Sequence, residues 1–102
     1  MKKQPTYHQS EHEVQDQIIQ YLRIKQIFHW RNNVGRKHNL YFGLKGSGDI
    51  LGITPNGIFF SIEVKDYKGQ QSKEQERFQK DVEDNNGIYI LARDIEDVVD
   101  IL

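Results

Sequence analysis

Two acidic residues and a lysine form the pattern in this sequence that is best suited to chemistry. Asp49 ends the stretch Gly46-Ser47-Gly48-Asp49, and Glu63-Val64-Lys65 follows in the next strand-like segment. Side chains two residues apart on a strand share a face, so Glu63 and Lys65 are expected to project together. A hairpin between the two segments would bring Asp49 beside Glu63.

Such a group suggests metal-assisted hydrolysis of a phosphate ester. Paired carboxylates offer hard oxygen ligands to Mg²⁺, which binds few protein carboxylates and keeps several water molecules. The ammonium group of Lys65 could orient a metal-bound water and stabilise charge that grows on a phosphate oxygen. The alternative is a salt bridge across the strands that has no catalytic role.

Two acids near the start of the first predicted helix compete for the role of a third site carboxylate. At 100° per residue, Glu11 falls within about 40° of Gln15, Ile18 and Leu22, on the inward side of the helix. Glu13 falls roughly opposite and is explained by a capping box with Ser10. Because an unpaired charge on a buried face is costly, Glu11 is the predicted site residue.

The local sequence predicts three helices and four strands in the order α-β-β-β-α-β-α. Apolar residues at helical spacing indicate helices, β-branched and aromatic clusters indicate strands, and Asn-Gly indicates a hairpin turn. The expected elements are a helix from Ser10 to Lys25, a strand from Ile27 to Arg31, a loop from Asn32 to Gly48, strands from Asp49 to Thr54 and from Ile58 to Lys65 around the turn Pro55-Asn56-Gly57, a helix from Ser72 to Asp84, a strand from Ile88 to Ala92, and a closing helix begun by Asp94 with Ile95, Val98, Val99 and Leu102 as its apolar face.

Two details of these helices stay open at the level of sequence. Thr6 with Gln9 is a rival to Ser10 with Glu13 as the start of the first helix. In the second long helix Gln75 lies on the same side as Phe78 and therefore faces inward. It could serve as a site residue, or act only as the second half of a capping box.

Length and composition limit the chain to one small domain, residues 1–102, whose first nine residues are polar and expected to be frayed. The absence of cysteine excludes disulfides and thiolate metal sites and suits a reducing compartment. No apolar run approaches the roughly 20 residues that span a bilayer. We expect a cytoplasmic protein of bacterial or phage type, with no membrane partner.

Charge is distributed unevenly although the formal net charge is only −1. Between Gln17 and Gly48 there are six basic and no acidic residues, whereas residues 49–102 carry twelve acids and six bases. A basic block beside an acidic site suits contact with a phosphate backbone, although a merely solvated surface is the competing explanation. Arg31 is expected near the site, and Arg36, Lys37 and Lys45, interleaved with Trp30, Tyr41 and Phe42, are expected to follow the backbone.

Taken together, these residues resemble the PD-(D/E)xK nuclease superfamily and, within it, the small VRR-Nuc domains. The resemblance covers nearly the whole chain and depends on the order and spacing of several motifs. Gly48 replaces the proline of the superfamily's name. The matching positions are Glu11 with Gln15, Trp30-Arg31 with Asn33, Gly48-Asp49-Ile50, Glu63-Val64-Lys65, Ser72 to Phe78 with Gln75, and Gly87 before the last strand.

The resemblance implies a restriction-endonuclease-like α/β core with a central mixed sheet flanked by helices. It implies that Asp49, Glu63 and Glu11 bind Mg²⁺, with Mn²⁺ able to substitute, and that Lys65 assists the attacking water while Gln75 supports the site. We expect the backbone carbonyl of Val64 to be a further metal ligand and Asn33 to contact nucleic acid. Stand-alone domains of this type resemble homodimeric endonucleases that cleave branched DNA such as four-way (Holliday) junctions.

Three other interpretations were weighed against this one. His8-Gln9-Ser10-Glu11-His12 matches the H-x-x-E-H pattern of inverted zinc peptidases, but a third ligand and a substrate cleft are lacking in so small a chain. Gly46 and Gly48 lack the rest of a dinucleotide fingerprint, so no nucleotide cofactor is expected. A nucleic-acid-binding module that keeps the fold but does not cleave is the main alternative, and the intact Asp49, Glu63 and Lys65 argue against it.

Overall fold

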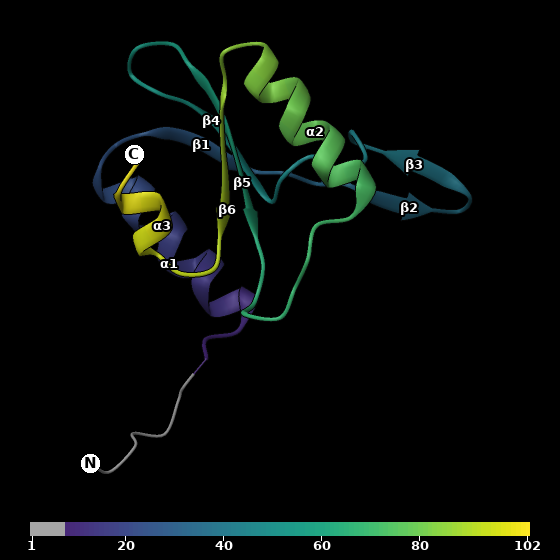
Figure 1. Ribbon diagram of the computed structural model, residues 1–102, viewed down its shortest axis with the longest axis horizontal. Helices are drawn as coiled ribbons and strands as arrows, with labels where there is room; N and C mark the ends of the chain where they lie inside the picture. The colour runs from purple at the N-terminus through teal and green to yellow at the C-terminus, as the bar shows by residue number, and fades with distance from the viewer. Residues whose placement is uncertain (1–7) are drawn as a thin grey trace.

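A four-stranded mixed sheet forms the centre of the protein in a computed structural model, which describes residues 8–102 apart from the side chains of Tyr41 and Phe42 (Figure 1). The order across the sheet is β1-β4-β5-β6. Its first three strands are antiparallel, and β5 and β6 are parallel. The strands are β1 (Phe28–Arg31), β4 (Ile50–Ile53), β5 (Phe59–Val64) and β6 (Ile88–Ala92).

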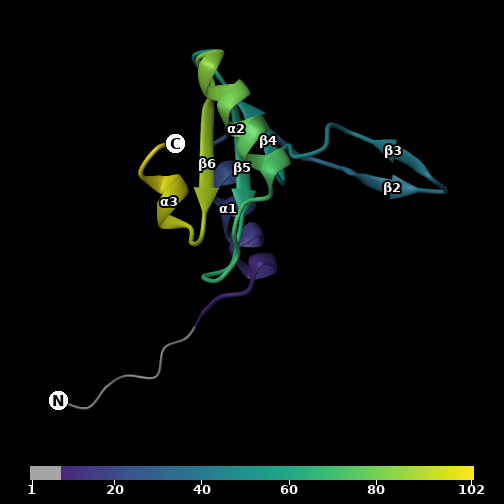
Figure 2. The same cartoon turned by 45° about the vertical axis from the view of Figure 1, so that its right-hand side comes forward.

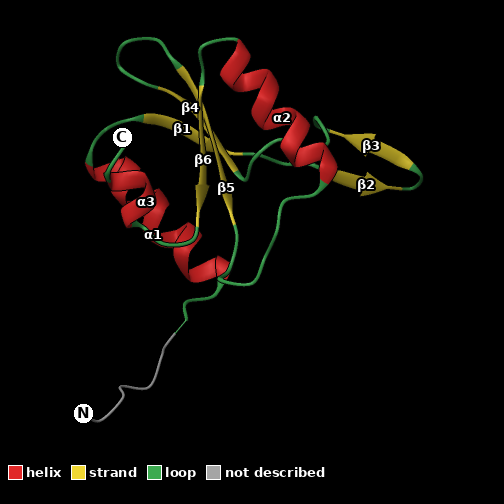
Figure 3. Cartoon of the chain, in the orientation of Figure 1, coloured by secondary structure: helices red, strands yellow, loops and turns green. Residues whose placement is uncertain are grey.

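Helices cover both faces of this sheet (Figure 3). The long helix α1 (Glu11–Ile24) and the short helix α3 (Glu96–Val99) pack on one face, and α2 (Lys73–Asp84) packs on the other. The main core lies between the sheet and the first pair of helices. It is formed by Val14, Ile18, Ile19, Leu22, Ile27, Ile50, Phe60, Ile62, Val64, Ile90, Ala92 and Val98.

Both predicted capping boxes are present, and they position the two long helices. The hydroxyl of Ser10 accepts from the backbone N–H of Glu13 at 3.1 Å, and the carboxylate of Glu13 accepts from the backbone N–H of Ser10. Ser72 and Gln75 make the same exchange at the start of α2. The rival start at Thr6 lies outside the described residues. Because each exchange satisfies two free N–H groups, these sequences begin helices where they do.

The predicted turn joins β4 to β5 and sets their register. Gly57 has φ +84° in the turn, and the backbone N–H of Thr54 donates to the carbonyl of Ile58 at 2.8 Å. In this register Ile50 pairs with Ile62. One residue further along, Asp49 therefore lies opposite Glu63, as the spacing predicted.

The segment predicted as a loop, residues 32–48, contains a small hairpin. Strands β2 (Gly35–Lys37) and β3 (Leu40–Phe42) pair with each other in a separate two-stranded sheet that extends away from the central sheet (Figure 2). Its turn residues His38 and Asn39 have φ values of 51° and 64°, as a type I′ turn requires. The loop prediction was wrong here because three-residue strands without apolar alternation give no periodic signal.

The closing helix is shorter than the sequence suggested. Asp94 accepts from the backbone N–H of Asp97 at 3.2 Å, but the helix itself begins only at Glu96. Val98 is buried, whereas Val99, which was placed on the apolar face, is 46% exposed. A single helical turn presents only one residue squarely to the sheet, which explains the error.

Apart from the hairpin, the element order is the predicted α-β-β-β-α-β-α, and the mixed sheet between helices confirms the small restriction-endonuclease-like α/β core. Among the described residues no helix has the length and apolar character needed to cross a membrane.

Ile62 gives a direct test of this packing. It is fully buried between β4 and β6, whereas Ile53 on the neighbouring strand is 38% exposed. We expect Ile62→Ala to lower the free energy of unfolding by about 2–5 kcal/mol through lost burial and a residual cavity. Ile53→Ala, the matched control, should cost less than half as much in urea denaturation. Equal losses would contradict the described core.

Candidate active site

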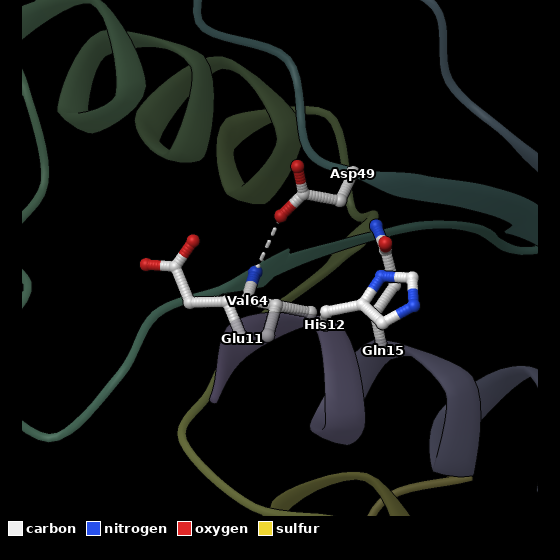
Figure 4. A pocket seen from close by; sticks show the side chains of 5 residues that line it. All are labelled: Glu11, His12, Gln15, Asp49 and Val64. Carbon is white, nitrogen blue, oxygen red and sulfur yellow. Dashed lines mark hydrogen bonds between the residues drawn. The ribbon is translucent and has the colours of Figure 1, made fainter. Parts of the chain in front are cut away.

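The carboxylate of Asp49 is held at the end of the central sheet by the backbone. The backbone N–H of Asp49 donates to the carbonyl of Ile62 at 2.8 Å, and its Oδ2 accepts from the backbone N–H of Val64 at 2.7 Å. Figure 4 shows this second bond, with Asp49 on one wall of a pocket and α1 on the other. These hydrogen bonds fix the side chain of Asp49 against strand β5, beside Glu63.

Glu63 lies on the face of the sheet that α2 covers and is only 5% exposed. Its Oε1 accepts from Nε2 of Gln75 at 3.1 Å and lies 3.9 Å from Nζ of Lys65. Oε1 of Gln75 meanwhile accepts from the backbone N–H of Ser72 at 2.8 Å. Both roles considered for Gln75 are therefore present, since one amide caps the helix and contacts the buried acid.

Burial perturbs the pKa of both carboxyl groups, and the charge of a neighbouring acid adds to the effect on each. Burial raises the pKa of Asp49, and the hydrogen bond from Val64 opposes that rise. Burial and then the charge of Asp49 raise the pKa of Glu63 to about 8, although the nearby ammonium group of Lys65 lowers it. Without a cation, the pair therefore keeps a proton near neutral pH. A divalent cation would take the place of that proton and relieve the repulsion.

Glu11 approaches the same place from the first turn of α1. It lines a pocket of about 240 Å³ with His12, Gln15, Asp49 and Val64, and its charge contributes to raising the pKa of Asp49. Its side chain is exposed rather than buried, and Oε1 accepts from the backbone N–H of Asp66 at 3.3 Å. The helical angle correctly placed Glu11 on the side of α1 that faces the pocket. The expectation of burial was wrong because this turn faces an open pocket instead of a strand.

The donor set suits a cation that needs few protein ligands. Among residues 8–102 as described, no three His, Asp or Glu side chains lie close enough together to hold a metal ion, so Glu11, Asp49 and Glu63 do not form a three-carboxylate cluster. Asp49 and Glu63 remain as an adjacent pair beside a pocket with space for water. Two carboxylates with several waters match the requirements of Mg²⁺. The backbone of Val64 lines that pocket, and its carbonyl stays a predicted ligand.

Two residues that position Asp49 were missed at the level of sequence. The amide of Asn32 donates to Oγ of Ser47 at 2.6 Å and to the carbonyl of Gly48 at 2.8 Å. The hydroxyl of Ser61, fully buried, accepts from the backbone N–H of Gly48 at 3.1 Å. The only feature of the sequence that pointed to either residue was the presence of Ser61 within the otherwise apolar start of a strand, two residues before Glu63.

The sequence also matches a known protein family. Residues 8–97 match the family described as nuclease-related domain. The chain belongs to this family. No curated protein sequence matches it. The match supports a nuclease domain, as the resemblance implied, but it does not extend to the narrower VRR-Nuc assignment.

The basic residues of this nuclease-related domain do not all lie at the pocket. Arg31 does approach it, because its guanidinium donates to Oε1 of Gln15 at 3.0 Å and to Asp16 at 3.2 Å. Arg36 and Lys37 lie on the hairpin strand β2. The remaining predicted contacts are Asn33, which is exposed just before the hairpin, and Lys45, which lies 3.5 Å from Glu74 of α2.

The zinc-peptidase pattern is not assembled in the described structure. His8 precedes α1 and stacks on Tyr67, with ring centroids 3.6 Å apart. His12 lies 3.3 Å from Asp16 on the same helix. The two histidines therefore have different partners and do not face a common metal position.

The raised pKa of Glu63 predicts how stability depends on pH. The proton bound to Glu63 adds to the free energy of unfolding. This contribution is complete below the ordinary pKa of 4.5 and is lost as the pH rises through about 8. Glu63→Gln, which imitates the protonated side chain, should therefore be stabilised relative to the unchanged protein by an amount that grows between pH 5 and 9. Urea denaturation in EDTA measures this difference.

Glu76→Gln is the matched control, because Glu76 is an exposed acid on the same helix as Gln75. The free energy of unfolding of this control should differ little from that of the unchanged protein across the same pH range. A difference for Glu63→Gln that does not change with pH would contradict the described environment of the carboxyl pair.

Proposed function

We propose that this nuclease-related domain is a Mg²⁺-dependent DNA endonuclease that hydrolyses phosphodiester bonds. The observation that carries the proposal is the pair formed by the half-buried Asp49 and the buried Glu63, with Nζ of Lys65 3.9 Å from the carboxylate of Glu63. Such a group has little value for stability, because burying like charges is costly. Its cost is understandable if the pair holds a cation during catalysis.

Each residue has a role that follows from its position. Asp49 and Glu63 would hold the cation, which when bound supplies Lewis-acid stabilisation of the phosphate and a more acidic water. Lys65 would stabilise negative charge on the phosphate and orient the attacking water. Gln75 orients Glu63 through the 3.1 Å hydrogen bond. Glu11, across the pocket, would act through water held between it and the cation.

DNA binding is assigned to the basic surface that begins at Arg31 and continues along the hairpin. Arg36 and Lys37 project from a ribbon that stands clear of the central sheet (Figure 2). A two-stranded ribbon fits the major groove, and basic side chains on it contact phosphates without reading sequence. Asn33 and Lys45 flank the ribbon at its base and extend this contact.

The preferred substrate is proposed to be branched DNA, such as a four-way junction, cleaved by a homodimer. A small domain offers little surface for reading bases, so DNA shape is the better basis for discrimination. A two-fold dimer matches the symmetry of a junction and places one site on each of two opposed strands. The resemblance to stand-alone VRR-Nuc proteins supports the same proposal.

Removing one carboxyl group of the pair tests the proposed hydrolysis. Asp49→Ala should abolish cleavage of a labelled four-way junction in Mg²⁺, because one of the two cation ligands is gone. Binding to the junction should persist, and the melting temperature without metal should not fall, since repulsion is removed along with the hydrogen bond. Cleavage on denaturing gels, anisotropy and thermal denaturation measure the three quantities.

The two acids of α1 provide a matched pair of controls. Glu11→Gln should reduce turnover about a hundredfold, on the scale of a lost catalytic group, whereas Glu13→Gln keeps the capping box and should change it little. Full cleavage by Asp49→Ala, or by the unchanged protein in excess EDTA, would overturn the proposal. Junction binding without any cleavage in Mg²⁺ or Mn²⁺ would favour the non-cleaving module.

The hairpin variant Arg36→Ala/Lys37→Ala tests the DNA surface. It should weaken binding to junctions of every sequence alike and reduce the salt slope of binding by about one to two units. Arg23→Ala/Lys25→Ala removes the same charge from the far end of α1 and should have a smaller effect. Equal losses, or equal cleavage of junction and linear duplex by a protein that sediments as a monomer, would contradict the branched-DNA proposal.

A further inference from the structure

A second pocket lies beside the candidate active site. It measures about 190 Å³ and is lined by His8, Gln9, Tyr67, Arg93 and Asp94. The two pockets approach each other at the segment that follows β5.

Asp66 is the residue that joins the two pockets. Its backbone N–H donates to Oε1 of Glu11, in the first pocket, at 3.3 Å. Its carbonyl accepts from Nη1 of Arg93, in the second, at 2.5 Å. Tyr67 follows Lys65 by two residues, and His8 precedes Glu11 by three. Residues that line the two pockets are therefore joined through the backbone of Asp66.

The second pocket is lined by an aromatic pair, His8 and Tyr67, with one cation, Arg93, and one acid, Asp94, beside it. The rings of His8 and Tyr67 are stacked with centroids 3.6 Å apart and planes at 16°. Tyr67 is 52% exposed, and Nζ of Lys68 lies 5.4 Å from its ring centroid. An exposed aromatic residue on a loop contributes little to a core. Ordered by a second ring and flanked by Lys68 and Arg93, it has the composition of a nucleobase-stacking surface.

We propose that this pocket binds an unpaired nucleobase adjacent to the scissile phosphate, by stacking it against the His8–Tyr67 pair. The proposal rests on the proposed endonuclease function and specifies its substrate class. A base inside an intact duplex is stacked on its neighbours and cannot reach a side pocket without leaving the helix. Among branched DNAs, the preferred substrate is therefore one whose nucleotide at the cut is unpaired, as in a flap or in a junction whose base pair beside the branch point has opened.

The experiment compares two 12-mers that differ only in their bases. Fluorescein-labelled dT₁₂ and a 12-mer of abasic nucleotides carry the same phosphates, so their difference in affinity isolates the contribution of the bases. Anisotropy is measured in EDTA at fixed salt with the full chain, and a denaturing gel checks that the strand is intact. The unchanged protein should bind dT₁₂ at least about fivefold more tightly than the abasic strand.

Tyr67→Ala should bind both strands equally, whereas Tyr67→Phe, which keeps the ring, should retain the preference. Phe28→Ala is the matched control, because Phe28 is a comparably exposed aromatic residue on the edge strand β1 and should leave the preference unchanged. Thermal denaturation shows whether each variant is folded. A preference that survives in Tyr67→Ala, or no preference in the unchanged protein, would overturn the proposal.

The outcome is separable from that of the endonuclease proposal. A protein that shows the Tyr67-dependent preference but never cleaves DNA in Mg²⁺ would contradict the endonuclease function and support the base-binding pocket. A protein that cleaves DNA but binds both 12-mers equally would support the endonuclease function and overturn the base-binding pocket.

Discussion

The structure depends on one costly arrangement, in which the half-buried carboxyl group of Asp49 lies beside the buried carboxyl group of Glu63 at the end of a sheet. The strand β4 begins at Ile50, so the backbone N–H of Val64 on β5 has no backbone partner there, and the Asp49 carboxylate accepts it at 2.7 Å. A side chain thus continues the sheet's hydrogen bonding by one step. This bond, together with the register of β4 and β5, holds Asp49 against Glu63 despite the desolvation that raises both pKa values and the charge of Asp49 that further raises the pKa of Glu63.

The identity of residue 75 follows from this arrangement. A capping box accepts either Glu or Gln at this position. Here Oε1 accepts from the backbone N–H of Ser72, which leaves the amide nitrogen of Gln75 to face the Glu63 carboxyl. A glutamate at position 75 could still cap the helix, but it would place a third carboxylate against the buried pair. The site therefore selects Gln from two residues that the helix would accept equally.

Local signals explain which parts of the fold could be predicted from the sequence. The caps at Ser10 and Ser72 and the Asn-Gly turn involve residues three or four apart, so they are readable without tertiary structure. The hairpin of β2 and β3 was missed because its short strands lack apolar alternation. The exposure of Glu11 was missed because a helical angle ranks the sides of a helix but does not show where the sheet beneath it ends.

The candidate site likewise contains residues that local patterns predict and residues that they do not. Asp49, Glu63 and Lys65 were identifiable because residue type and strand spacing suffice to bring them together, and Gln75 because of the side of its helix on which it lies. The positions of Asn32 and Ser61 depend on contacts between residues at least thirteen apart in the chain, which no local pattern encodes. The metal, the DNA substrate and the individual roles stay predictions, because they concern molecules outside the chain.

The glycine that precedes Asp49 is explained by those two residues. Both polar backbone groups of Gly48 are used, since its N–H donates to the Ser61 hydroxyl and its carbonyl accepts from Asn32. A Cβ at position 48 would lie 2.3 Å from Oγ of Ser61 and 2.7 Å from the Ile62 carbonyl, so β5 could not approach so closely. The proline of the superfamily's name would add that Cβ and remove the N–H, leaving a fully buried serine without this partner. Gly48 and Ser61 thus form a matched pair that brings the backbone before Asp49 directly against the strand that carries Glu63.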